Sequence, residues 1–280
     1  MRKIKVVTDS TVDLSDAVLA EHGVEMVPLS FTIDGQTYTD RVDITPETFI
    51  QKMTQANELP KSSQPAAGTF VELYDRLGAE GYDVLSIHMT GGMSGTVRSA
   101  AMAADMTDTK VTVVDSKYIS RGLGFQVLEA AQMAEEGRSM EDIVARLDEI
   151  RAATRLYVVV DTLENLVKGG RIGRGKALIG SLLHIKPIGT LNDGVYTPVM
   201  NARSHAQVVK HLAKQFADDV KGSTIKGVGL VHAEGCKLAE NLKEKIAELT
   251  GYSNIEIDYT GPVISTHTGP GAIGFTYYFE

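Results

Sequence analysis

Hydroxyl side chains and glycines are concentrated in one short stretch, TGGMSGT at residues 90–96. An apolar run that ends at Met89 precedes it, and an alanine-rich segment with helical spacing follows it. The hydroxyls of Ser94 and Thr96, together with the free amides of a helix N-terminus, are suited to binding an anion. Serine and threonine are also preferred helix N-caps. The stretch by itself therefore predicts either an anion-binding residue or a helix cap.

A serine near glycines at a strand-to-helix turn is also typical of the nucleophile elbow of hydrolases, G-x-S-x-G. In this chain Gly95 directly follows Ser94, one position earlier than that pattern requires. His267 is a candidate base, because it lies in STHTGPGAIG, whose glycines and proline predict a specially shaped turn. A serine hydrolase or acyltransferase that uses Ser94 and His267 is therefore the alternative function.

Two further patterns resemble known sites but lack an essential part. GGRIGRGKA at residues 169–177 has glycine and lysine spacing close to that of a P-loop, but Ala177 replaces the hydroxyl that binds magnesium. His232-Ala233-Glu234 resembles the H-x-E of zinc deaminases, but no P-C-x-x-C follows it. The sequence therefore predicts no nucleotide site, no metal site and no cofactor. The basic side chains of the first pattern are expected to meet a ligand carboxylate or a protein partner: Arg171, Arg174 and Lys176.

Four stretches with hydroxyls or glycines fall where strands are expected to end: residues 8–11, 62–65, 90–96 and 265–271. In open α/β sheets, ligands bind beyond the carboxyl ends of the strands. We therefore expect the four stretches to contribute to one site.

The first half of the chain alternates apolar strands with helices. Strands are expected at residues 3–9, 24–33, 82–89 and 110–116, and helices at 14–23, 43–56, 96–106, 122–136 and 139–152. Near-continuous apolar strands joined by helices are typical of a parallel sheet covered on both faces. We therefore expect an α/β domain with a parallel sheet over residues 1–153.

The pattern changes after residue 153. A strand at 155–161, short helices at 162–170 and 176–184, and a hairpin at 185–200 around an Asp193-Gly194 turn are expected first. A helix at 204–220, a strand at 226–233, a helix at 236–249 and strands at 255–260 and 272–280 follow. This mixture predicts a smaller α+β domain over residues 154–280.

Composition narrows the class of protein. The formal net charge of −8 argues against a nucleic-acid partner, because phosphate backbones are bound by clustered Lys and Arg. Cys236 is the only cysteine, and no apolar run approaches the length of a membrane span. We expect a cytoplasmic protein.

Five local patterns together resemble the DegV family, which includes the fatty-acid-binding subunits of bacterial fatty acid kinase. They are TDST at 8–11, SSQP at 62–65, MSGT at 93–96, LVKGGRI at 166–172 and THTGPG at 266–271, and their order and spacing cover nearly the whole chain. The resemblance implies a DegV-like fold that buries one long-chain fatty acid between its two domains. It also implies that the protein is not an enzyme and has no catalytic residues.

The resemblance further implies a set of residues for the carboxylate. Ser62, Ser94, His267 and Arg171 would bind it, and Ser63, Thr96 and Arg203 would contact the head group or a partner protein. A buried carboxylate is costly unless it is hydrogen-bonded and paired, which hydroxyls and a nearby cation provide. The implied partner is a separate ATP-dependent fatty acid kinase that forms a bound acyl phosphate for phospholipid synthesis, with transient membrane contact.

The chain departs from the family pattern at several positions. Gly91 and Gly92 stand where hydroxyl residues are frequent, and Ala66 replaces a common serine, so both places are expected to widen or reshape the head-group region. Asn201 stands where a basic residue is frequent, which would weaken steering toward an acidic partner.

Overall fold

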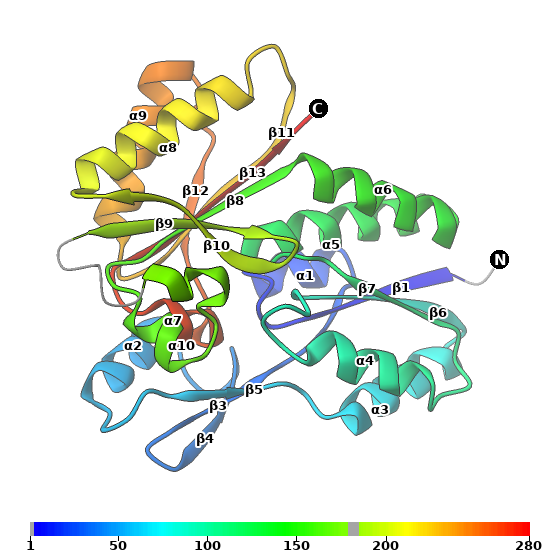
Figure 1. Cartoon of the computed structure of the whole chain (residues 1–280). Helices are drawn as coiled ribbons and strands as arrows, with labels where there is room; N and C mark the ends of the chain where they lie inside the picture. Colours follow the sequence, from blue (N-terminus) through cyan, green and yellow to red (C-terminus); the bar gives the residue numbers. More distant parts are fainter. Residues whose placement is uncertain (1–2, 179–184) are drawn as a thin grey trace.

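The computed structural model describes residues 3–178 and 185–280 (Figure 1). The N-terminal part is built on a parallel sheet with the strand order β2-β1-β6-β7. Its strands are β1 (Lys3–Asp9), β2 (Glu25–Val27), β6 (Tyr82–His88) and β7 (Val111–Asp115). The helices around it are α1 (Asp16–Glu21), α3 (Ala67–Ala79), α4 (Thr96–Ala104), α5 (Ser120–Glu135) and α6 (Met140–Ala153).

Both faces of this sheet are covered, as the sequence predicts. Val7 and Val84 belong to a buried cluster with side chains of α3 and α4, whereas Val6 and Leu85 belong to a cluster with side chains of α5. Adjacent strand residues point to opposite faces, so each strand serves both clusters. Figure 1 shows α3 and α4 on one side of the sheet and α5 on the other.

A small antiparallel sheet of β3 (Ser30–Ile33), β4 (Gln36–Thr39) and β5 (Lys61–Ser63) follows, with α2 (Pro46–Gln55) beside it. The single strand predicted at 24–33 is therefore wrong, because it divides into β2 and β3 in two different sheets. Pro28 lies at the break. A proline has no backbone N–H to donate to a ladder, so the parallel pairing of β2 ends at Val27.

The C-terminal part holds a mixed sheet of six strands in the order β10-β9-β8-β13-β11-β12. The strands are β8 (Thr154–Val159), β9 (Lys186–Asn192), β10 (Val195–Ala202), β11 (Ile225–Ala233), β12 (Glu256–Tyr259) and β13 (Ala272–Phe279). Although the segment is shorter than the N-terminal one, its sheet is wider. The predicted division at residue 153 falls between α6 and β8, and the division into domains stays a prediction.

Helices α8 (His205–Asp219) and α9 (Cys236–Thr250) share a buried cluster with residues of this sheet. Helix α5 contacts β1 of the first sheet and also β8, β11 and β13 of the second, so the two halves meet over a shared apolar surface. The hairpin predicted at Asp193-Gly194 is confirmed, with φ angles of 51° and 75° at its two turn residues. No helix of the described segments is long and apolar enough to cross a bilayer.

The described residues also form the short helices α7 (Glu164–Lys168), η1 (Gly173–Leu178, a 3-10 helix) and α10 (Pro262–Thr268). The specially shaped turn predicted from the glycines and proline of residues 265–274 is confirmed at 269–271, where Gly269 and Gly271 have φ angles of +75° and +84°. The residues before it, 265–268, belong to α10, which the sequence does not predict. Of the helix expected at 176–184, the first three residues lie in η1 and residues 179–184 lie outside the described residues. Helix α10 packs against α2 and α7.

Candidate functional site

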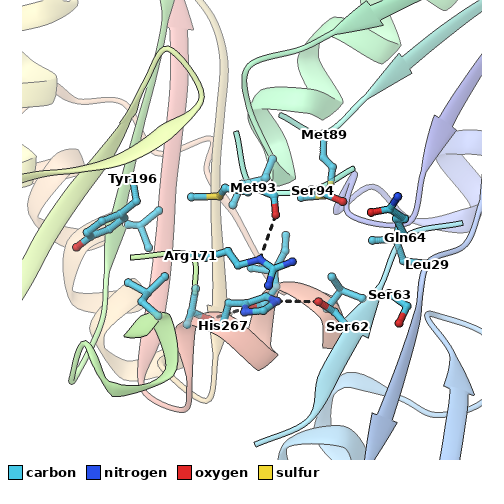
Figure 2. Close-up of a pocket in the computed structure, with 16 residues that line it drawn as sticks. Leu29, Ser62, Ser63, Gln64, Met89, Met93, Ser94, Arg171, Tyr196 and His267 are labelled. Carbon is cyan, nitrogen blue, oxygen red and sulfur yellow. Dashed lines mark hydrogen bonds between the residues drawn. The ribbon is translucent and has the colours of Figure 1, made fainter. Parts of the chain in front are cut away.

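A cavity of about 330 Å³ lies between the N-terminal and C-terminal parts of the chain (Figure 2). Its wall is mainly apolar, formed by Leu29, Met89, Met93, Ile119, Val158, Leu166, Tyr196, Val263 and Ile264. The polar lining consists of Ser62, Ser63, Gln64, Ser94, Arg171, His267 and Thr268. This volume is at the lower end of the usual range for small-molecule sites.

A smaller cavity of about 20 Å³ continues inward and shares Ile119, Val158, Ile264 and Thr268 with the larger one. Further lining comes from the strands of the second sheet and includes Leu156, Val231, Ala272 and Ile273. The hydroxyl residues Ser120, Thr260 and Thr268 also line this smaller cavity, whose wall is otherwise apolar, and most hydrogen-bonding side chains of the site lie in the outer cavity.

His267 and Ser62 form a hydrogen bond across the site, with 2.8 Å between the imidazole Nε2 and the serine Oγ. His267 comes from the last turn of α10, whereas Ser62 lies on β5, so 205 residues separate them in the sequence. Burial, and secondly the charge of Arg171, lower the pKa of His267 to about 4. The imidazole is therefore neutral near pH 7. In the tautomer that carries its proton on Nε2, it leaves the Ser62 hydroxyl free to donate to a ligand.

Arg171 brings a positive charge to the same site. Its Nε donates to the carbonyl oxygen of Met93 at 3.1 Å, and its Nη1 donates to that of Gly169 at 2.6 Å. The guanidinium thereby connects the turn after α7 to the turn before α4, and Figure 2 shows it between Met93 and His267.

The glycines before Arg171 are required by the position of His267. A Cβ atom at Gly169 would lie 2.3 Å from His267 Nδ1, so no other residue fits without moving the ring. Gly170 has a φ of +72°, a conformation that favours glycine. The GGR sequence therefore lets the backbone turn closely around the imidazole and return Arg171 to the cavity.

The helix N-cap predicted at Ser94 or Thr96 is wrong, because the N-cap of α4 is Gly95, which makes no side-chain cap hydrogen bond. Ser94 nevertheless lies beside the first turn of α4 and at the cavity. Its Oγ accepts a hydrogen bond from the Thr96 N–H at 3.2 Å and lies 2.9 Å from Thr96 Oγ1, which satisfies the first amide of α4. It also lines the cavity, on the side opposite Ser62 and His267 in Figure 2. Thr96 is buried and is absent from the cavity wall.

Comparison with known proteins identifies the family. The family model described as "Uncharacterised protein, DegV family" matches residues 3–280. The chain belongs to the DegV family. It is 47% identical over 281 residues to a DegV domain-containing protein of Listeria monocytogenes, with 100% of both chains covered.

Solved structures agree with the family in fold. A DegV-family protein from Thermus thermophilus, described as fatty-acid-binding, superposes with a TM-score of 0.93 at 35% identity over 100% of both chains. DegV of Bacillus subtilis, described as a fatty acid binding protein, gives a TM-score of 0.91 at 34% identity, again over 100% of both chains. The parallel-sheet domain and the second mixed-sheet domain are thus the DegV fold.

The TDST segment of this DegV-family protein does not line the cavity. It binds the backbone of Met89, a residue that does line it. Asp9 is fully buried and accepts hydrogen bonds from the Thr11 hydroxyl at 2.7 Å and from the Met89 N–H at 2.8 Å. It also accepts from the Thr11 N–H at 3.0 Å and lies 3.1 Å from His88 Nδ1. Burial raises the pKa of Asp9, but His88 and these donors lower it overall. The expectation that all four stretches line one site is therefore wrong for residues 8–11.

The glycine pair of the DegV chain also differs from expectation, since neither residue lines the cavity. A Cβ atom at Gly92 would lie 2.6 Å from the carbonyl oxygen of Gly194, at the tip of the β9–β10 hairpin. Thr90 Oγ1 donates to the same oxygen at 3.0 Å, and the Gly91 N–H donates to Asp115. The pair therefore permits a close backbone contact between the two halves of the molecule.

The expectation at Ala66 about the head-group region needs correction, whereas the partner-surface roles expected at Arg203 and Asn201 stay predictions. Ala66 is the N-cap of α3 and makes no side-chain cap hydrogen bond, so a serine there would cap a helix and not reshape the site. Arg203 is exposed outside the cavity, and its N–H donates to Gln207 Oε1 at 2.7 Å. Asn201 is exposed on β10. Ser63 does line the cavity, as proposed from the resemblance.

The hydrolase arrangement differs from the one predicted. Ser62, and not Ser94, is the serine in contact with His267. Within residues 3–178 and 185–280, His267 Nδ1 has no hydrogen-bond partner, so no acid there orients the imidazole as in a catalytic triad. The same residues contain no group of three or more His, Cys, Asp or Glu placed to hold a metal ion.

Proposed function

We propose that the protein binds a long-chain fatty acid, with the acyl chain in the cavity and the carboxylate among Ser62, Ser94, Arg171 and His267. The observation that carries this proposal is one cavity with an apolar interior and an outer wall of hydroxyls, an imidazole and a guanidinium. Each buried methylene contributes about 0.8 kcal/mol, so an enclosed acyl chain supplies most of the affinity. The fatty-acid-binding descriptions of the Thermus and Bacillus relatives support the same class of ligand.

The polar groups suit a carboxylate. Arg171 supplies a formal positive charge, and charge-assisted hydrogen bonds are stronger than neutral ones. His267 is neutral near pH 7 because burial lowers its pKa to about 4. Its imidazole can therefore orient the carboxylate by a hydrogen bond but adds no positive charge. Ser62 and Ser94 approach from two sides of the cavity and can both donate to the carboxylate oxygens.

The partner follows from the family resemblance. We propose that a separate ATP-dependent kinase phosphorylates the bound carboxylate, whose oxygen attacks the γ-phosphorus of ATP while ADP leaves. The carrier then holds an acyl phosphate for phospholipid synthesis and is not itself an enzyme. An ATP-dependent partner places the protein in the cytoplasm, with transient contact at a membrane. Ser63 lines the cavity and is the candidate for contact with the head group, whereas Arg203 is exposed outside the wall and is a candidate for contact with the kinase.

Native mass spectrometry of the protein purified from a bacterial host tests the ligand. We expect a bound mass that matches a long-chain fatty acid, and less retention in Ser94→Ala and Ser62→Ala. Ser253→Ala is the matched control, because Ser253 is exposed and absent from the cavity wall. Protein that is free of lipid and takes up no oleate would contradict the proposal.

The serine hydrolase or acyltransferase is the second candidate, and the hydrogen bond between Ser62 and His267 is the observation in its favour. A fluorophosphonate probe would label a nucleophilic serine covalently. We expect no labelling of Ser62 or Ser94, because an imidazole with a pKa of about 4 is a weak base. Labelling of either serine in lipid-free protein would favour the hydrolase.

A further inference from the structure

Helix α10 is the element that places His267, yet it has little intrinsic stability. It spans seven residues, of which Val263, Ile264, His267 and Thr268 line the cavity. Its N-cap is Gly261, which has no side chain to cap the first turn. Because so short a helix is unstable alone, tertiary contacts must fix its position.

Asp13 provides two such contacts from the other half of the molecule. It lies in the loop between β1 and α1, and its carboxylate accepts a hydrogen bond from Thr260 Oγ1 at 2.7 Å. The Gly261 N–H donates to its second oxygen at 2.9 Å. The residues joined by these bonds are 247 and 248 positions apart in the sequence. Asp13 therefore connects the two residues that lead into α10 to the N-terminal part of the chain.

A second buried carboxylate, Asp40, lies at the same point. A Cβ atom at Gly261 would lie 3.7 Å from Asp13 Oδ1 and 3.9 Å from Asp40 Oδ1, so both acids converge on the start of α10. The Ser10 hydroxyl donates to the other oxygen of Asp40 at 2.6 Å. Among the described residues, Asp40 Oδ1 has no hydrogen-bond partner that meets ordinary geometry.

Two acids at one buried point are costly. Burial raises the pKa of Asp13, and burial together with the Asp13 charge raises the pKa of Asp40 to about 7. Arg41 is the cation that favours the charged form of both, and the Val263 amide of α10 does the same for Asp40. Apolar residues would pack here without this cost. Apolar residues, however, could not accept the hydrogen bonds that Asp13 accepts from Thr260 and Gly261.

We propose that Asp13 and Asp40 are positioning residues, which hold the first turn of α10 and thereby fix His267 against Ser62 at the cavity. The effect on affinity rests on the proposed function, whereas the effect on His267 does not. Neither acid touches the proposed ligand, and neither lines the cavity.

The first test needs no ligand. In lipid-extracted protein, histidine NMR titration should give His267 a pKa of about 4 in the unaltered chain. In Asp13→Asn the side-chain NH2 group faces one of the two donors, Thr260 Oγ1 or the Gly261 N–H, and cannot accept from it. We expect α10 to shift, His267 to become less buried and its pKa to rise toward 6.5. Asp108→Asn, at an exposed site, should leave it unchanged. An unchanged pKa in folded Asp13→Asn would overturn the proposal.

The second test is a double-mutant cycle with oleate. We expect Asp13→Asn to weaken oleate binding about tenfold in the otherwise unaltered chain and less than twofold in a His267→Ala background. An equal loss in both backgrounds would indicate a merely structural role and overturn the proposal.

Asp40→Asn should give the same pattern with a smaller loss, because Asp40 accepts no bond as well aligned from α10. If Asp13→Asn does not fold, Thr260→Val removes one donor and leaves the acid in place. We then expect a loss of about threefold that again disappears in the His267→Ala background. Failure of the unaltered protein to bind oleate would reject the proposed function, and the NMR titration would still decide the role of Asp13.

Discussion

Replacement of Gly169 by alanine tests the geometry of the site with a single methyl group. Gly169 has φ −76° and ψ −9°, which alanine adopts without strain, so any change in the site comes from the added methyl group. The new Cβ would lie 2.3 Å from His267 Nδ1 and 2.9 Å from the Asn165 carbonyl oxygen. The imidazole must move by about 1 Å to restore ordinary van der Waals contact.

Such a movement disturbs the contact with Ser62, because the Nε2–Oγ distance of 2.8 Å leaves no room for the ring to approach and would exceed the hydrogen-bond limit if the ring withdrew by that amount. Loss of one hydrogen bond contributes about 0.5–1.5 kcal/mol, so we expect oleate affinity to fall about two- to tenfold. Overpacking costs about 1–3 kcal/mol, so the free energy of unfolding should fall by a similar amount.

Isothermal titration with oleate and thermal unfolding followed by circular dichroism measure the two effects. Gly68→Ala is the matched control, since a Cβ atom at this exposed position of α3 meets nothing within 4 Å. We expect it to leave affinity unchanged and to stabilise the protein by about 0.5–1 kcal/mol. Folded Gly169→Ala with unaltered oleate affinity would refute the role given to His267.

Four other changes have defined outcomes. Burial lowers the pKa of His267 from 6.5 in the unfolded chain to about 4 in the folded protein. Between these two pH values the unfolded state binds a proton on this imidazole that the folded state does not. The free energy of unfolding measured in urea should therefore fall by about 1–3 kcal/mol as the pH drops through that range. The fall should be smaller in His267→Gln. Gly92→Ala should lower the melting temperature by about 2–10 °C through its clash with Gly194, without removing a cavity residue. Ala66→Ser should add about 1 kcal/mol of stability as an N-cap and leave retained lipid unchanged. Val158→Phe, where the two cavities join, should shift the co-purified fatty acids to shorter chains by mass spectrometry.

Local sequence patterns predict most elements of the fold but not how they come together. Alternating apolar runs identify β1, β6 and β7, and the Asp193-Gly194 pair identifies the β9–β10 hairpin. The break at Pro28 is also visible in the sequence, since proline cannot continue a strand ladder. The contact of Gly92 with Gly194 depends on packing between residues 102 positions apart, which no local pattern contains.

The sequence likewise predicts only part of the candidate site. The resemblance names Ser62, Ser94, Arg171 and His267, and the structure brings all four to one cavity. The glycines after His267 predict the turn that the structure places at 269–271, but seven residues are too few for the sequence to show the helix α10 before it. The apolar wall draws on several elements, so Leu29 and Tyr196 could not be selected from periodicity alone.

The central place of β13 in the second sheet has a consequence for how the protein is made. The strands of the first sheet are complete once Asp115 has been synthesised, whereas β13 must insert between β8 and β11 and ends at Phe279. At about 5–20 residues per second, the interval on a ribosome is on the order of ten seconds. During that time the apolar face of α5 that β13 later covers has no partner. A chain that stops before β13 keeps every lining residue of the 330 Å³ cavity but lacks Ala272 and Ile273 of the inner one, and we expect it to engage chaperones instead of forming the site.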